Sequence, residues 1–275
     1  MKTIIIPTDF SAIATNAMRY GIDMATAIKG SILLLHVYQV PVSYGEVPVA
    51  LISLDELQKN AQERMEVLKQ EVEHITSGRM KVYGEVKLGN VIDELQNLCE
   101  KVNPFAVVMG TRGHSAVENV IFGSNTLTAI RHLHWPVICV PPGKTFGTGI
   151  KRIGLACDFR DVVNTVPAHA ITDLQKEFDA ELHVLNVDYH DKHFNASTPE
   201  ESALLHTLLE EAHAVYHFIE NKDVENGIND FAEKNNLDLL ITIPKKHKLL
   251  QSLFKPGSTR QLVYQSHVPV MCVHE

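Results

Sequence analysis

The chain has 275 residues, of which 45% are hydrophobic and 21% are charged, as is typical of soluble globular proteins. Its formal net charge of −8 argues against a general nucleic-acid binder, whose binding face would be basic. The length exceeds that of most compact domains and fits two domains of about 130–140 residues each.

Cysteine usage and hydropathy limit the cellular setting. The four cysteines, Cys99, Cys139, Cys157 and Cys272, lie in separate apolar runs without a C-x-x-C pair, so buried, reduced thiols are expected. The apolar run in the N-terminal MKTIIIPTDFS is too short for a signal peptide, and no stretch approaches the roughly 18 apolar residues of a membrane span. We therefore expect a cytoplasmic protein without a membrane partner.

Apolar runs alternate with amphipathic segments through the first half. The pattern predicts strands over residues 3–8, 31–40, 80–86, 105–110 and 136–140, and helices over 11–30, 53–75, about 91–101 and from about 125. Ser11 is placed to cap the first helix and Gly30 to end it. Ser53 and Glu56 form a capping box on the second helix. Its expected apolar face consists of Leu54, Leu57, Ala61, Leu68, Val72 and Ile75.

The second half repeats the first, which indicates a tandem duplication. HWPVICV (134–140) is answered by HVPVMCV (267–273), and the same spacing pairs Tyr83 with Tyr216. IIIPTDFS (4–11) likewise matches IGLACDFR (153–160), which pairs Asp9 with Asp158. Proline and glycine dominate the linker, PPGKTFGTGIK. We predict one domain over residues 1–143 and a second over 150–275.

Both halves predict the same fold. In the second half, TPEESALLHTLLEEA predicts a helix with Thr198 as cap, Pro199 at the first helical position and Glu201 completing a capping box. Continuous Ile, Val and Leu strands separated by helices predict an α/β fold with a doubly wound parallel sheet in each half. Such sheets bind ligands where their strands end and the strand order reverses, which places PTD (7–9) and GTRG (110–113) at one edge.

Residues 107–130, VVMGTRGHSAVENVIFGSNTLTAI, place glycines between a strand and a helix. A glycine-rich turn lets backbone N–H groups converge on an anion, and the following helix adds its N-terminal dipole and free amides. The Ser124 hydroxyl can also donate to a phosphate oxygen. The spacing matches neither the Walker loop nor the G-x-G-x-x-G fingerprint, and a purely structural role in tight turns is the alternative for these glycines.

Gly110, Gly113, Gly123 and Ser124, with the spacing G-x2-G-x9-G-[ST], together with the N-terminal PTDFS, resemble the universal stress protein family. The resemblance covers nearly the whole chain as two tandem copies. It implies a five-stranded Rossmann-like fold with strand order 3-2-1-4-5, and binding of ATP or AMP in members that keep the motif. We expect Mg²⁺ to accompany the nucleotide.

The resemblance also assigns roles by position. The residues implied to contact the nucleotide are Pro7, Thr8 and Asp9 at the adenine and ribose, Val37 beside the adenine, Gly110 and Gly113 in the ribose and phosphate turn, and Gly123, Ser124 and Asn125 at the phosphates. Arg112 and His114 lie inside the loop, where they either reach phosphate or are solvated.

The glycine pattern is eroded in the second copy. The residues at the positions of Gly110, Gly113 and Gly123 are Ile243, Lys246 and Pro256. A shift of one residue restores a glycine, Gly257, at the third position, but it places Pro244 and His247 at the first two. Proline lacks an N–H and fixes φ, and Pro167 also perturbs the helix that follows ACD. Although Asp158 is kept, we predict that domain 2 does not bind ATP in this manner.

Histidines suggest metal sites in two places. His190 and His193 lie in a polar loop with Asp188 and Asp191, which is either a structural zinc site or a solvated loop. His213 and His217 would form a clamp on a helix, but the repeat places them near a strand, where four residues span roughly 13 Å.

These observations predict a nucleotide-binding regulatory protein of the stress response. Domain 1 would bind ATP or AMP, and domain 2 would be its pseudo-dimer partner, with PVICV and PVMCV paired within one chain. A homodimer of whole chains is left open. The alternatives are a slow ATP-hydrolysing enzyme, in which Asp9 positions a metal ion, and an interaction scaffold without nucleotide. No nucleophile–base pair is visible in the sequence, so no catalytic residue is assigned.

Overall fold

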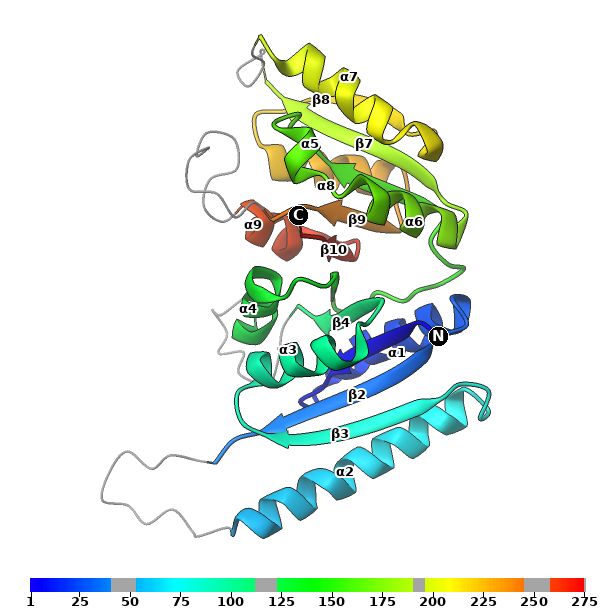
Figure 1. Cartoon of the computed structure of the whole chain (residues 1–275), viewed down its shortest axis with the longest axis vertical. Coiled ribbons are helices and arrows are strands. Elements are labelled where there is room, and N and C mark those ends of the chain that lie inside the picture. Colours follow the sequence, from blue (N-terminus) through cyan, green and yellow to red (C-terminus); the bar gives the residue numbers. More distant parts are fainter. Residues whose placement is uncertain (41–52, 112–122, 190–195, 245–257, 275) are drawn as a thin grey trace, which may run out of the picture.

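The computed structural model describes residues 1–40, 53–111, 123–189, 196–244 and 258–274 (Figure 1). The first half contains β1 (Thr3–Pro7), α1 (Ala12–Ala27), β2 (Ser31–Tyr38), α2 (Leu54–Ile75), β3 (Val82–Leu88), α3 (Val91–Val102), β4 (Ala106–Gly110), α4 (Ser124–His132) and β5 (Val137–Val140). The second half contains β6 (Arg152–Ala156), α5 (Val162–Thr165), α6 (Ala168–Phe178), β7 (Glu181–Asp188), α7 (Thr198–Leu208), the 3₁₀ turn η1 (Glu210–Ala212), β8 (Val215–Glu220), α8 (Val224–Lys234), β9 (Leu239–Thr242), α9 (Ser258–Gln265) and β10 (Val270–Cys272).

The strands form one ten-stranded sheet in the order β3-β2-β1-β4-β5-β10-β9-β6-β7-β8. Each half therefore contributes five strands in the order 3-2-1-4-5, which confirms the predicted pair of Rossmann-like, doubly wound α/β units. Neighbouring strands within each half are parallel. At the seam β5 and β10 are antiparallel, with Ile138 opposite Met271.

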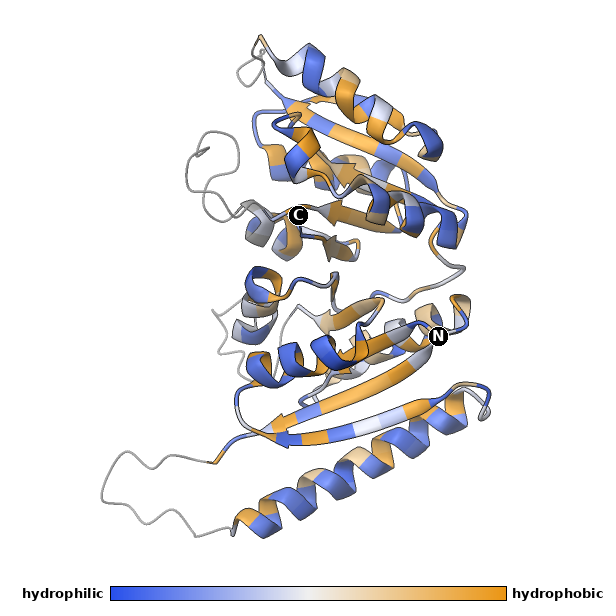
Figure 2. Ribbon diagram, in the orientation of Figure 1, coloured by the Kyte–Doolittle hydropathy of each residue, from blue (hydrophilic) through white to orange (hydrophobic). Residues whose placement is uncertain are grey.

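Helices cover both faces of the sheet because its strands are apolar on both sides. On one face α1, α2, α5, α6 and α7 contribute buried residues to one core cluster, and α3, α4, α8 and α9 contribute to a second cluster on the other face. Figure 2 shows the same arrangement as apolar strands between helices whose outward faces are hydrophilic.

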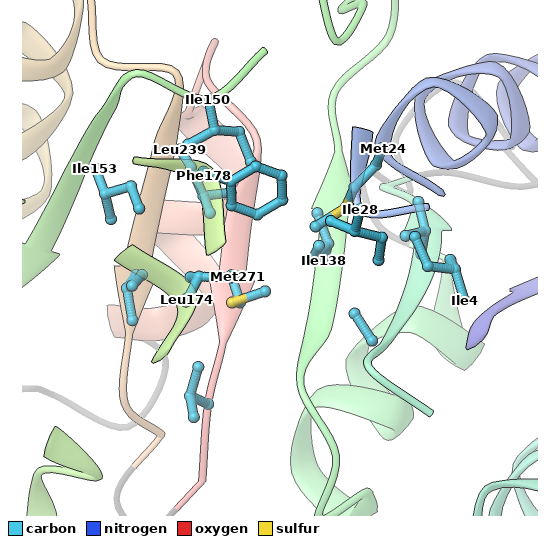
Figure 3. Close-up of a cluster of buried hydrophobic side chains, with 14 of the residues drawn as sticks. Ile4, Met24, Ile28, Ile138, Ile150, Ile153, Leu174, Phe178, Leu239 and Met271 are labelled. Carbon is cyan, nitrogen blue, oxygen red and sulfur yellow. The ribbon is translucent and has the colours of Figure 1, made fainter. Parts of the chain in front are cut away.

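The core continues across the seam between the two halves. Ile138 and Met24 of the first half and Met271 and Phe178 of the second belong to one buried cluster (Figure 3). The Phe178 ring lies 6.5 Å from the ring of Phe105, measured between centroids. The linker also takes part, because Phe146 is buried against Tyr20 and Phe178.

Predicted helix starts are confirmed at α1 and α2. The Ser11 hydroxyl accepts the Ala14 N–H at 3.1 Å, and the capping box between Ser53 and Glu56 is complete. Helix α1 ends just before Gly30, as predicted, and the Gly30 N–H donates to the Ala25 carbonyl at 2.8 Å, but the conformational reason differs. Lys29 takes the left-handed conformation (φ 51°), whereas a Cβ on Gly30 would lie 2.8 Å from the Lys2 carbonyl oxygen, so Gly30 permits a close backbone approach.

Two side-chain predictions in the helices also differ from the structure. On α2, Ala61 and Val72 are buried as predicted, but Leu54 and Ile75 at the two ends are about half exposed, and the buried Met65 was not predicted. On α7, Thr198 is already helical and does not cap. Glu201 accepts the Val162 N–H at 2.8 Å and so joins α7 to α5 rather than completing a capping box.

The strand register corrects the pairing of Tyr83 with Tyr216. Tyr83 lies beside Leu33, and the residue in the equivalent place in the second half is Val215, beside His183. Tyr216 therefore corresponds to Gly84, whose missing side chain lets Met65 of α2 approach the sheet. The spacing between the two repeats that the sequence indicated is therefore correct at β8 to within one residue.

His217 lies on β8, as expected from the repeat, so it forms no helical clamp with His213. Its Nε2 atom lies 3.0 Å from Nδ1 of His183. Among the described residues, no group of three or more His, Cys, Asp or Glu side chains is arranged to hold a metal ion. The histidine-rich loop with His190 and His193 lies outside the described residues. None of the described helices is long and apolar enough to cross a bilayer.

Candidate functional site

A cavity of about 520 Å³ opens in the first half at the ends of β1 and β4. β1 lies between β2 and β4, where the strand order reverses, so the cavity occupies the expected position in a doubly wound sheet. Its volume is within the usual range for small-molecule sites. The site residues expected from the sequence that line it are Pro7, Thr8, Asp9, Val37, Gly110, Gly123, Ser124 and Asn125. Arg112, Gly113 and His114 lie outside the described residues.

The loop after β1 is held by its own side chains. The Thr8 hydroxyl accepts the Phe10 N–H and the Asp9 carboxylate accepts the Ser11 N–H, each at 3.0 Å. The Thr8 N–H donates to the Leu35 carbonyl at 2.8 Å, which ties the loop to β2. These bonds turn the chain from β1 into α1 and present Thr8 and Asp9 to the cavity.

His36 lies behind this loop. Its Nδ1 atom is 2.8 Å from the Thr8 carbonyl oxygen, and its ring centroid is 4.5 Å from that of Phe10. Burial lowers the pKa of His36 below its usual value, and the positive charge of Arg64 lowers the pKa further. The hydrogen bond to Thr8 and the negative charge of Asp9 raise the pKa, but they only partly offset this effect. Because a carbonyl oxygen only accepts hydrogen bonds, Nδ1 carries the hydrogen of this contact.

Gly110 ends β4 and borders the cavity. A Cβ at this position would lie 2.6 Å from Ile13 Cγ2 and 3.0 Å from the Ile13 carbonyl oxygen. Gly110 is thus required by the close packing of α1 on β4. Its φ is not positive, so this contact, and not an unusual backbone conformation, explains the glycine.

The N-terminus of α4 forms the opposite wall. Gly123 is its N-cap and offers no side chain to the first-turn amides, which have no intrahelical acceptor. The first turn also carries no acidic side chain. The Thr126 hydroxyl donates to the Gly110 carbonyl at 2.9 Å and fixes α4 against β4. This end of α4 therefore presents N–H donors and a positive dipole to an anion.

Sequence reasoning missed several lining residues, among them Gln39, Val91 and Thr126. Gln39 follows Val37 by two residues, a spacing that alternation along a strand could have indicated. Val91 begins α3, and the start of a helix after a parallel strand is a further signal. Leu35 and Met109 add apolar surface. The cavity thus combines an apolar side with a polar end, and Asp9 is its one charged residue among those described.

The second half differs at the equivalent place. Ile243 replaces Gly110, and the single helix α1 is replaced by the one-turn α5 and by α6, which begins after Pro167. Val187 on β7 is the counterpart of Val37 on β2. A Cβ on Gly227 of α8 would lie only 2.8 Å from Val187 Cγ1. Helix α8 therefore packs closely on Val187, which is buried.

Comparison with known proteins places both halves in one family. The model of the universal stress protein family matches residues 1–141 and 149–274. A universal stress protein of Methanocaldococcus jannaschii is 29% identical over 146 residues, which cover 52% of this chain and 84% of the relative. Universal stress protein G of Escherichia coli O157:H7 is 32% identical over 144 residues, covering 50% of this chain and 98% of the relative.

The two-domain arrangement also has a solved counterpart. The crystal structure of a universal stress protein from Archaeoglobus fulgidus superposes with a TM-score of 0.74 at 18% identity, covering 99% of this chain and 98% of that chain. At this identity the likeness concerns the fold, which is shared over both halves.

Proposed function

Because the chain belongs to the universal stress protein family as a tandem two-domain member, we propose that it is a nucleotide-binding regulatory protein of the stress response. In this proposal domain 1, residues 1–143, binds ATP or AMP. The observation that carries it is the cavity in which the Thr8–Asp9 loop, Val37 and the N-terminus of α4 meet.

The lining chemistry fits the two ends of such a ligand. Val37, Leu35, Val91 and Met109 offer an apolar surface for the adenine ring. The first-turn amides of α4 suit the phosphates, because they are donors without intrahelical acceptors at the positive end of a helix. In the alternative of a slow ATP-hydrolysing enzyme, Asp9 would instead hold Mg²⁺ jointly with phosphate oxygens, since Mg²⁺ commonly uses one or two carboxylates together with its substrate's phosphates.

Domain 2, residues 150–275, is proposed to be a partner without a nucleotide. Support comes from the antiparallel pairing of β5 with β10, which covers two strand edges within one chain. Further support comes from Ile243, which replaces Gly110, and from the loss of the other motif glycines in the sequence of this half. The pair of domains would then act as an intramolecular pseudo-dimer.

Gly113 provides the mutational test. We expect Gly113→Val to weaken binding of Mg-ATP and of AMP about tenfold or more, because a β-branched side chain in the phosphate turn blocks the approach of the ligand. Calorimetric titration gives the dissociation constants, and thermal unfolding shows whether the fold is kept. Lys246→Val changes the equivalent position of domain 2 and is the matched control.

Three outcomes of this test distinguish a nucleotide site in domain 1 from the alternatives. Lost binding with an unchanged unfolding temperature, and normal binding by Lys246→Val, support the site in domain 1. Equal loss of stability and binding would favour glycines that serve only the turn. Failure of the unmodified protein to bind either nucleotide would contradict the proposal and favour the interaction scaffold.

A further inference from the structure

His36 supports the nucleotide loop from outside the cavity. A carbonyl oxygen only accepts hydrogen bonds, so the 2.8 Å contact between His36 Nδ1 and the Thr8 oxygen requires Nδ1–H to donate. The Thr8 carbonyl belongs to the peptide unit that joins Thr8 to Asp9. Because that unit is planar and trans, fixing its carbonyl also fixes the direction of the Asp9 N–H.

The loop is also held from its far side. Phe10 adopts a left-handed conformation (φ 61°), which is uncommon for a residue with a bulky side chain. Its ring packs on His36, and the Arg64 guanidinium of α2 lies 4.1 Å from the ring centroid. The strained turn that follows Asp9 is therefore held between β2 and α2.

Domain 2 contains the same bond made by a different residue. Asn186 Nδ2 donates to the Cys157 carbonyl at 2.9 Å, and Cys157 occupies the place of Thr8. The Cys157 N–H donates to Leu185, as the Thr8 N–H donates to Leu35, and Phe159 is left-handed like Phe10. The position therefore requires a side-chain N–H donor, and asparagine satisfies it in this fold.

We propose that His36 is a positioning residue of the nucleotide site, which holds the Thr8–Asp9 peptide in the orientation that binding needs. This inference rests on the proposed function. The residue acts through the loop and not by contact with the nucleotide, since the described lining residues of the cavity do not include it.

The test compares removal of the donor with its replacement. His36→Leu and His36→Ala remove the N–H, and we expect the folded variants to bind Mg-ATP about tenfold more weakly. His36→Asn supplies the donor that domain 2 uses and is expected to restore affinity to within about threefold of the unmodified protein. Asn186→Leu removes the same bond from domain 2 and is expected to leave affinity unchanged. Calorimetric titration and thermal unfolding are measured for each variant.

Each other outcome overturns the inference. If His36→Asn binds as weakly as His36→Leu, the hydrogen bond is not what the site needs. If Asn186→Leu weakens binding equally, the effect passes through overall stability. Full affinity in His36→Leu would remove the role of His36 while leaving the proposed function intact, whereas no binding by the unmodified protein would remove both.

Discussion

At the scale of single residues, glycines show what a sequence can and cannot reveal. Gly110 and Gly123 were predicted to border a ligand site, and both line the cavity. The reason for Gly110 was not predictable, because it depends on Ile13, a residue distant in sequence that α1 brings against β4. Likewise, the N–H of Gly30 donates to the Ala25 carbonyl near the end of α1, but its lack of a side chain is explained by the Lys2 carbonyl. Such contacts depend on the three-dimensional structure and leave no local pattern.

The crowding at Gly110 predicts a cost in stability. We expect Gly110→Ala to lower the free energy of unfolding by about 1–3 kcal/mol, because the new methyl group would meet a backbone oxygen that cannot easily move. Urea unfolding measures the change. Gly84→Ala is the control, since its closest contact is the flexible side chain of Met65, and it is expected to cost less. Equal costs in the two variants would contradict this account of Gly110.

At the scale of elements, local signals were reliable where their partners are local. The caps at Ser11 and Ser53 involve residues within one helical turn, and both are present. Thr198 does not cap because it is already helical, and the predicted capping box is absent because Glu201 bonds to Val162 of another helix. The helix pattern also correctly placed the start of α4 within one residue, and with it the amides that face the cavity.

Helix α4 predicts opposite effects on stability and binding. Ser124→Asp places a negative charge in the first turn, which is expected to stabilise the fold by about 0.3–1 kcal/mol. The same charge is expected to weaken ATP binding about tenfold or more by repelling the phosphates. Ser124→Asn is the neutral control of similar size. If Ser124→Asp bound ATP as well as Ser124→Asn does, the phosphates could not lie at this helix end.

At the scale of the whole molecule, the sequence predicted two doubly wound units, and the structure joins them into one sheet. The duplicated PVICV and PVMCV segments indicated which strands would meet. The buried linker residue Phe146 and the packing of Phe105 on Phe178 could not be predicted, because they depend on how one half lies against the other. At the seam, a hydrogen bond with Cys139, together with burial, raises the pKa of Cys272, so both thiols are part of the core.

This shared core predicts cooperative unfolding. Trp135, the single tryptophan, lies in the first half, whereas circular dichroism reports on both halves. We expect the two signals to change in one coincident transition. Met271→Asp places a charge in the seam and is expected to separate them. Separate transitions in the unmodified protein would contradict a continuous core.

The number of nucleotides bound by each chain tests the central claim most directly. Domain 1 has the cavity and the intact glycine motif, whereas Ile243 replaces Gly110 in domain 2 and the other motif glycines are eroded. Calorimetric titration of the unmodified protein with Mg-ATP is therefore expected to show one site per chain. Two sites per chain would contradict the proposed division between a nucleotide-binding domain and its partner.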